Sequence, residues 1–440
     1  MIHMKDLVLQ KILTPYLAWC ARQIIARHQP LIIGITGSVG KSSTKEAIYC
    51  VLKNRFRVRR SLGNLNNEIG LPLTIISESE PKGNWLKWIS VLIKGFSQGL
   101  ARSKKYPRIL ILEMAVDRPG DMKYLLTLAP CKIGIITNIG VTHLEYFKDV
   151  KHILKEKSAL VKQVPGDGLA MLNYDDFSLR SLTKTLKKPI LSFGFRPGAD
   201  IRATDLKIGF SPGLGEGVSL AHGVSFRINY KTIFLPIELP NVISKALVYS
   251  VLAAITVGVH FNMNLVEIAK NLKDFRPLPG RMQLLRGKRG NIIIDDTYNA
   301  APNSTKASLE ILALVKSRKK TVILGDMLEL GVLEEPAHKE LAKQIYPVAS
   351  KVILVGKRTA NTHKELRKLG FPKDKIFHFR IVSSLIKKLP SLIGKGEVIL
   401  IKGSQGMRME KAAEKLIPIK NWKMLTRQDK YWRRKPVKEI

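Results

Sequence analysis

The sequence predicts an α/β fold made of two successive α/β domains, and three observations support this prediction. Near residue 31, an apolar run of strand length is followed by a glycine-containing loop and a helical pattern. Similar apolar runs alternate with helical patterns through the second half of the chain. The 440 residues are more than one ordinary core accommodates, and the 45% content of hydrophobic residues is typical of a globular protein.

The chain begins with a helical pattern and continues with a strand, a loop and a second helix. Apolar residues recur at roughly helical spacing over residues 1–30 and stop near Pro30, which predicts one or two helices. The apolar run 31–35 predicts a strand, which leads through the loop into the next helical pattern. Further strands are expected at 109–112 and 133–137.

A change of pattern separates the two halves of the chain. Residues 199–238 alternate polar and apolar side chains and predict hairpins at the edge of the first domain. A helix is expected over 244–257, and the two prolines and the glycine of 275–280 mark a boundary. Beyond it, buried strands alternate with helices, and these strands are expected at 291–294, 321–324, 351–355 and 398–401.

The last segment differs from both domains. Residues 421–440 are basic, contain Trp422 and Trp432, and have little core periodicity, which predicts a tail that docks on the surface or stays mobile. The predicted organisation is therefore a helical segment at 1–30, a central domain at 31–278, a C-terminal domain at 279–420 and a basic tail at 421–440.

The net charge is the unusual bulk property, because 74 Lys and Arg residues against 35 Asp and Glu residues give +39. Such a charge favours anionic partners, including nucleotides, phosphorylated substrates, nucleic acid and acidic membranes. The basic residues are scattered along the chain and no recognised nucleic-acid motif occurs, so no specific nucleic-acid partner is expected. A host whose proteins are generally basic explains the charge equally well.

Cysteine usage and the N-terminal segment predict a cytoplasmic protein. Cys20, Cys50 and Cys131 lie far apart, so neither a disulfide framework nor a zinc cluster is expected. No uncharged apolar run is long enough to span a membrane, and residues 1–30 mix basic and apolar residues without a small-residue cleavage site.

The loop at residues 34–43 has the chemistry of a phosphate-binding loop. It follows a strand and opens a helix, where backbone N–H groups and the helix N-terminus can hold phosphates. Lys41 is expected to reach the β- and γ-phosphates of a nucleotide, and Ser42 to bind Mg²⁺. The strict form of this motif has glycine where this chain has Ile35, so the loop is a variant.

This variant spacing resembles the Mur ligase family, and the resemblance extends from residue 31 to about 416. Among the branches of the family, the blocks NLNNEIG, DDTYNAAPNS and KGSQGMRMEK are most like the D-alanyl-D-alanine-adding branch. The resemblance implies a P-loop central ATPase domain followed by a Rossmann-like C-terminal α/β domain. It is carried by eight blocks in the family's order: TGSVGKSSTKE (36–46), GNLNNEIGLPLT (63–74), LEMAVDRPGDM (112–122), ITNIGVTHLEYF (136–147), GRM (280–282), DDTYNAAPNS (295–304), LGDMLELG (324–331) and IKGSQGMRMEK (401–411).

The resemblance also implies an activity, that of an ATP-dependent ligase of peptidoglycan precursor synthesis. A substrate carboxylate would attack the γ-phosphate of ATP to give an acyl phosphate, and an amine such as D-alanyl-D-alanine would then displace phosphate. The implied cofactors are ATP and two Mg²⁺ ions. The implied substrate is a small molecule or a peptide-nucleotide, and the chain is expected to act as a monomer.

Family motifs assign roles to residues of the first domain. Glu113, at the end of a strand, would bind Mg²⁺, and His143 would hold a second metal ion. Lys157 matches a lysine that CO₂ carbamylates in the family, which turns a cation into an anionic metal ligand. Asn66, Asn67 and Glu68 would line the acceptor side, and the implied nucleotide-binding residues are Thr36, Gly37, Ser38, Gly40, Lys41, Ser42, Ser43 and Asn138.

Family motifs likewise assign roles in the second domain. Arg281 would reach the ATP phosphates, and Asp296 would hydrogen-bond the ribose. Lys402 and Ser404, followed by Gly406 at a strand-to-helix turn, would recognise the carboxylate of the incoming amino component. Tyr298 and Asn299 would lie close to the substrate, and the catalytic residues would be Lys41, Lys157, His143 and Arg281.

Two features depart from the family's pattern. Muramyl-peptide ligases carry an N-terminal domain for the uridine nucleotide, and here the phosphate loop begins at residue 34, so such a domain is not expected in this sequence. A UDP-linked substrate would then be held differently, or the acceptor would be another molecule, as in folylpolyglutamate, cyanophycin or archaeal wall-peptide ligases. Near the adenine, this chain has Ala246 and Ser250 where the family places histidine and asparagine.

A third hypothesis assigns no ligase activity to the chain. The protein would then be a basic P-loop ATPase that binds nucleic acid or a membrane.

The segment 85–100 has large apolar residues at helical spacing with basic residues beside them. The preferred interpretation is an ordinary helix that packs in the core while its lysines reach solvent. The alternative is a helix that lies in a membrane interface as a peripheral contact, with the basic tail adding attraction to anionic lipids. The apolar residues are Trp85, Trp88, Ile89, Leu92, Ile93, Phe96 and Leu100.

Overall fold

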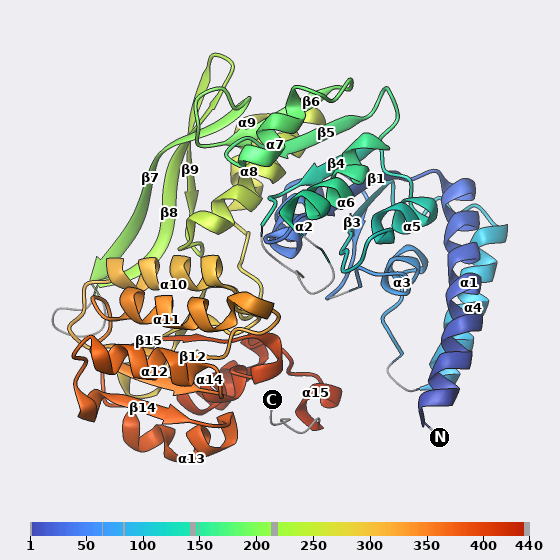
Figure 1. Cartoon of the computed structure of the whole chain (residues 1–440). Helices are drawn as coiled ribbons and strands as arrows, with labels where there is room; N and C mark the ends of the chain where they lie inside the picture. Colours follow the sequence, from blue (N-terminus) through green and yellow to red (C-terminus); the bar gives the residue numbers. More distant parts are fainter. Residues whose placement is uncertain are drawn as a thin grey trace. The chain divides into compact units, whose positions relative to one another are not determined.

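The protein contains two β-sheets with helices packed around them. The computed structural model describes residues 2–63, 65–81, 84–140, 147, 149–212 and 219–434. By the density of its contacts, the chain divides into two units, coloured blue to yellow-green and mainly yellow to red in Figure 1. The first unit is the chain up to Asp205 with Phe226–Ile237 and Leu247–Phe275. The second is Leu206–Ser225, Glu238–Ala246 and the chain from Arg276 onward. The predicted domain boundaries stay predictions.

The first sheet is an open α/β sheet whose strands lie in the order β2-β3-β1-β4-β5-β6-β7-β8-β9. Neighbours from β2 to β7 are parallel. β3, β4 and β5 are buried throughout, as expected for apolar strands covered on both faces. The hairpins predicted for 199–238 form β7 to β9 at one edge of this sheet. The strands are β1 Leu31–Thr36, β2 Val58–Arg60, β3 Ile109–Glu113, β4 Ile133–Ile136, β5 Leu169–Asn173, β6 Ile190–Gly194, β7 Ile201–Pro212, β8 Ser219–Tyr230 and β9 Ile233–Leu239.

A core of aliphatic residues joins one face of this sheet to its helices. Leu17 and Ile24 of α1 pack there with Leu71 of α3, Leu110 of β3 and Leu125 of α5. The helical segment predicted for 1–30 is one helix, α1, with Pro15 inside it. The helices are α1 Ile2–His28, α2 Lys41–Leu52, α3 Gly70–Ile76, α4 Trp85–Leu100, α5 Asp121–Leu128, α6 Val150–Lys162, α7 Phe177–Thr183, α8 Lys245–His260 and α9 Leu265–Leu272.

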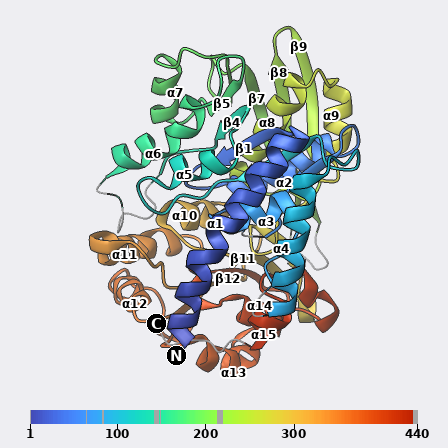
Figure 2. The same ribbon diagram turned by 90° about the vertical axis from the view of Figure 1, so that its right-hand side faces the viewer.

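The structure bears out only part of the preferred interpretation of segment 85–100. α4 lies beside α1 (Figure 2). Among the residues of α4, only Val91, Gly95 and Gly99 are buried. The two glycines let α1 approach closely, since a Cβ atom at Gly95 would lie 3.1 Å from Cys20 Sγ. Val91 joins the core of the first unit, and Trp88 and Leu92 pack against it, so α4 packs in the core as predicted, but through one face only. The other large apolar side chains of α4 are exposed, which an ordinary core-packed helix does not predict.

The second sheet has the strand order β10-β11-β15-β12-β13-β14. β10 is antiparallel to β11, and the other neighbours are parallel. The four strands predicted for this half are confirmed as β11, β12, β13 and β15. The strands are β10 Gln283–Arg286, β11 Ile292–Asp296, β12 Lys320–Gly325, β13 Lys351–Val355, β14 Ile376–Phe379 and β15 Val398–Lys402, and the helices are α10 Pro302–Leu314, α11 Glu334–Ile345, α12 Thr359–Lys368, α13 Val382–Leu392, α14 Glu410–Leu416 and α15 Lys430–Arg434.

The described part of the basic tail docks on the second unit. Leu425 joins its hydrophobic core, and Trp422 Nε1 donates to the Glu414 carbonyl oxygen at 2.9 Å. Arg427 is buried, and its guanidinium lies 3.0 Å from a carboxylate oxygen of the buried Glu410. Of the two predicted behaviours of the tail, the structure shows docking for residues 421–434.

Among the helices that the structure describes, none combines the length and the apolar character needed to cross a bilayer.

Candidate active site

The phosphate loop lies at the carboxyl end of β1, the central strand between β3 and β4. Gly37 and Gly40 have φ values of 144° and 88°, which favour glycine. A Cβ atom at Gly37 would lie 2.0 Å from Thr137 Oγ1. Gly40 is the N-cap residue of α2 and has no side chain to cap it, so the first amide groups of α2 suit an anion. Lys41 Nζ donates to the Gly37 carbonyl oxygen at 2.8 Å, within this loop.

Residues just after β4 hold the loop in shape. Asn138 accepts the Ser38 amide with its carbonyl oxygen at 3.0 Å and the Val39 amide with Oδ1 at 2.8 Å. Thr137 Oγ1 donates to the Val39 carbonyl oxygen at 2.5 Å. Asn138, predicted to face the nucleotide, is therefore a positioning residue for the loop in this structure.

Ser42 and Glu113 provide adjacent oxygen atoms beside the loop. Both are buried, and Ser42 Oγ donates to Glu113 Oε1 at 3.1 Å. Adjacent ligands of an octahedral Mg²⁺ ion with bonds of about 2.05 Å lie about 2.9 Å apart, so this spacing fits two ligands of one ion. Asn66 Nδ2 also donates to Glu113 Oε1, at 3.3 Å, which brings a predicted acceptor-side residue to the same carboxylate.

Lys157 lies on α6 with only 2% of its surface exposed. Burial and, to a smaller extent, the charge of Lys41 lower the pKa of Lys157 to about 7, against the opposing effect of Asp117 and Glu156. A substantial neutral fraction near pH 7 is the chemical requirement for an amine that reacts with CO₂. The residues present thus fit the predicted carbamylation.

The remaining predicted residues of the first unit lie around these groups or outside the described part of the chain. His143 lies outside the described residues. Asn67 Oδ1 accepts the Gly70 amide at 2.9 Å at the start of α3, while Glu68 is half-buried. Thr36 and Ser43 are buried, and Thr36 Oγ1 donates to the Met114 carbonyl oxygen at 2.9 Å. At the predicted adenine positions, Ser250 is buried, and its Oγ would lie 3.7 Å from a Cβ atom at Gly40.

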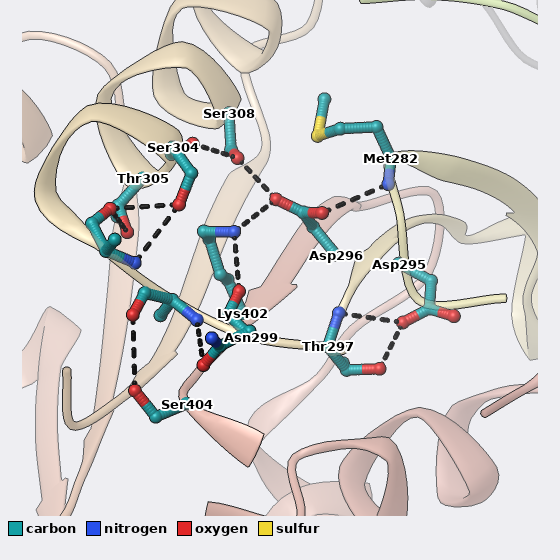
Figure 3. A network of polar contacts seen from close by, with 12 residues as sticks. Met282, Asp295, Asp296, Thr297, Asn299, Ser304, Thr305, Ser308, Lys402 and Ser404 are labelled. Carbon is teal, nitrogen blue, oxygen red and sulfur yellow. Dashed lines mark hydrogen bonds and ion pairs between the residues drawn. The ribbon is translucent and has the colours of Figure 1, made fainter. Parts of the chain in front are cut away.

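In the second unit, Asp296 and Lys402 meet at the carboxyl ends of β11 and β15 (Figure 3). Lys402 Nζ lies 2.5 Å from Asp296 Oδ2 and donates to the Asn299 carbonyl oxygen at 2.9 Å. Asp296 also accepts the Met282 amide at 3.1 Å and the Ser308 hydroxyl at 2.7 Å. The carboxylate and the ammonium predicted to contact ribose and substrate are thus both engaged in one buried network.

The neighbouring predicted residues surround this network. The Leu328 amide donates to Ser404 Oγ at 2.9 Å, and Asn299 Oδ1 accepts the Gln405 amide at 3.3 Å. The Arg281 guanidinium lies 4.0 Å from the centre of the Tyr298 ring, a cation–π contact. The structure therefore gathers Arg281, Asp296, Tyr298, Asn299, Lys402 and Ser404 at one end of the second sheet.

Three charged residues near these sites were not singled out from the sequence. Lys45 is buried, and its ammonium lies 3.3 Å from Glu113 Oε2. Its position three residues after Ser42 puts both on one face of α2, which was the available signal. Glu156 accepts the Gly120 and Met122 amides at 3.0 and 2.8 Å, at the start of α5. Asp295 is fully buried, and burial raises its pKa to about 6.

Comparison with known proteins decides the family. A sequence model of the Mur ligase middle domain matches residues 35–84 and 94–258, and a model of the Mur ligase glutamate ligase domain matches residues 280–405. A Bacillus subtilis protein named UDP-N-acetylmuramoyl-tripeptide--D-alanyl-D-alanine ligase is 30% identical, with 88% of this chain and 76% of the relative covered. The chain belongs to the Mur ligase family.

Two further relatives agree with this assignment. The Escherichia coli protein of the same name is 25% identical, with 91% of this chain and 78% of the relative covered. A crystal structure of the MurF ligase from Thermotoga maritima in complex with ADP superposes with a TM-score of 0.70 at 27% identity, with 91% of this chain and 83% of the other covered. The predicted family and the predicted fold class of this Mur ligase are confirmed.

Proposed function

We propose that this Mur ligase activates a peptide carboxylate with ATP and joins it to D-alanyl-D-alanine or a similar amine in peptidoglycan precursor synthesis. The relatives named above carry this activity in their names, and one of them was solved with ADP. As a member of the family, the chain is an ATP-dependent ligase. The predicted monomeric state and the cytoplasmic location belong to the same proposal.

In the first unit, the phosphate loop would bind the ATP phosphates. The amide groups at the start of α2 attract negative charge, and Lys41 would turn from the Gly37 carbonyl oxygen to the phosphoryl group. Ser42 and Glu113 would hold one Mg²⁺ ion, and carbamylated Lys157 would supply an oxygen ligand for a second. When bound, these ions neutralise charge that develops on the transferred phosphoryl group.

The reaction needs no nucleophilic side chain from the protein. The substrate carboxylate forms a bond to the γ-phosphorus while the bond to ADP breaks, and the resulting acyl phosphate is attacked by the amine. Phosphate leaves with the bonding electrons, and the amine loses a proton. Arg281 would assist at the phosphates, and the Asp296–Lys402 network would fix the loop that carries Tyr298 and Asn299.

The arrangement of Ser42, Glu113 and a buried, partly neutral Lys157 around one phosphate loop carries the proposal. Its test is phosphate release by the purified chain with ATP and Mg²⁺, with UDP-muramyl-tripeptide as acceptor and with or without D-alanyl-D-alanine. We expect release that requires both substrates and a ligated product of the corresponding mass.

ATP binding and a change of acceptor distinguish the proposed function from its alternatives. Protein that binds ATP but releases no phosphate with this acceptor would contradict the substrate assignment. Folate, cyanophycin-type peptide and lipid-linked acceptors would then be assayed in the same way. Protein that does not bind ATP would contradict the phosphate-loop assignment itself.

A further inference from the structure

α4 has two apolar faces, and only one of them packs against the protein. Val91, Gly95 and Gly99 are buried against neighbouring helices. On the other face, six large apolar side chains are between 44% and 67% exposed, namely Trp85, Leu86, Ile89, Ile93, Phe96 and Leu100. Figure 2 shows α4 side by side with α1 along its length.

These six residues form one continuous stripe. At about 100° per residue they all fall within an arc of about 100° on the helix surface. Trp19 of α1 extends the stripe, because its ring stacks on Phe96 with 6.0 Å between the ring centres. Ile12, one heptad before Trp19 on the same helix face, is 70% exposed. We call this surface the α1–α4 stripe. A contiguous exposed apolar stripe bordered by charged residues is typical of a protein or membrane interaction site.

Charge indicates what the stripe binds. Residues 7–30 and 84–105 contain no acidic residue. Beside the stripe or just after α4 lie Lys87, Arg102, Lys104 and Lys105, all of them exposed. A pocket of about 430 Å³ continues this basic region, and its charged lining residues are Lys53, Arg57, Arg59 and Lys105. A second copy of the chain would bring two such cationic surfaces together, whereas an anionic lipid surface complements both the charge and the apolar stripe.

The first half of the stripe also lies outside the shared family domain. The Mur ligase middle-domain model matches residues up to 84 and again from 94, which leaves out the part of α4 that holds Trp85, Ile89 and Ile93. This half of the stripe is therefore a feature of the chain that the match to the catalytic domain does not explain.

We propose that α1 and α4 dock the protein on an anionic bilayer. The stripe lies in the interfacial region of the lipid with the helix axes parallel to the surface, and the adjacent lysines and arginines contact lipid phosphates. This docking is peripheral, and it is independent of the ligase reaction.

Cosedimentation of the full chain with vesicles tests the proposal. We expect binding to vesicles that contain phosphatidylglycerol and much weaker binding to phosphatidylcholine alone. The double variant Ile89→Glu, Ile93→Glu should bind at least about tenfold more weakly, since it puts two charges into the exposed stripe that would enter the lipid. Phe234→Glu, which changes a 64%-exposed apolar residue of β9, is the matched control and should bind normally.

A second pair of variants tests the electrostatic contribution. Lys104→Ala with Lys105→Ala should weaken binding to anionic vesicles roughly tenfold. Lys387→Ala with Lys388→Ala, an exposed adjacent pair on α13, should not. Thermal unfolding of each variant shows whether its fold is retained.

Two outcomes would overturn the proposal. One is a wild-type chain that stays in the supernatant with both vesicle types. The other is a wild-type dimer in sedimentation velocity that the Ile89→Glu, Ile93→Glu variant converts to a monomer without any vesicle binding, which would assign the stripe to a second copy.

Discussion

The surroundings of Lys157 disfavour the charged form of its side chain. Burial and the nearby Lys41 lower its pKa to about 7, well below that of an ordinary lysine. The ammonium form dominates below that value and the neutral amine above it. Chemistry that needs the neutral amine should therefore appear as pH rises through 7.

The corresponding prediction concerns CO₂. Removing CO₂ and bicarbonate should reduce acceptor-dependent phosphate release, and bicarbonate should restore it. At a constant concentration of dissolved CO₂, activity should fall at least about tenfold from pH 8 to pH 6, because the neutral fraction drops from about 90% to about 10% and carbamate formation also releases a proton. Lys157→Met should abolish the response. Lys155→Met, an exposed neighbour on α6, should retain it. Full activity in CO₂-free buffer would contradict the carbamylation.

Lys45 is a second buried lysine, and its role is to balance Glu113. Lys45→Met leaves that carboxylate with less compensation, so it should lower the free energy of unfolding by about 3 kcal/mol in Mg²⁺-free urea titrations. Mg²⁺ and ATP should recover part of the loss if Glu113 binds the ion. Lys53→Met, at the exposed end of α2, should change stability by less than about 0.5 kcal/mol. Equal losses with and without Mg²⁺ would contradict the metal assignment of Glu113.

At the scale of elements, the phosphate loop and the segment after β4 form one unit. Thr137 and Asn138 bond to the loop, and Gly37 leaves the space that Thr137 occupies. The loop after β1 thus keeps its shape partly through contacts with the residues just after β4, and not through its own sequence alone.

Gly37→Ala tests this dependence. The new methyl group would collide with Thr137 Oγ1, and the φ of 144° also disfavours alanine, so ATP affinity should fall at least about tenfold in titration calorimetry. Gly166→Ala is the control, since no atom lies within 4 Å of its Cβ position. Unchanged affinity of Gly37→Ala would mean that the loop adapts without cost.

Local patterns in the sequence predicted the elements well. The central strands of both sheets, the loop and the helix α2 follow from apolar runs and glycine spacing, which act over a few residues. The strands β2, β5, β6, β10 and β14 were not predicted. The face of α4 that packs against the protein could not be predicted, because the segment has two apolar faces and periodicity does not distinguish them. The pairing of Lys45 with Glu113 spans 68 residues and depends on the sheet order, which the sequence does not display. The docking of the tail depends on Arg427 and Leu425, single residues without periodicity.

Over the whole molecule, the charge of +39 is spread through both units. A P-loop ATPase that used this charge to hold nucleic acid would respond to polyanions. The proposed ligase should not. We expect single-stranded DNA or heparin to change acceptor-free ATP hydrolysis by less than about twofold. Strong stimulation that disappears as salt rises would favour the polyanion-binding ATPase.

The position of β15 in the second sheet has a consequence for biosynthesis. β15 comes last among the strands of that sheet, yet it lies between β11 and β12, which leave the ribosome earlier. A nascent chain that stops before Val398 lacks the central strand, so β11 and β12 have no partner between them. The first unit can fold during translation, whereas the second must wait for the end of the chain. Ribosome-stalled chains should therefore resist proteolysis first in the amino-terminal half.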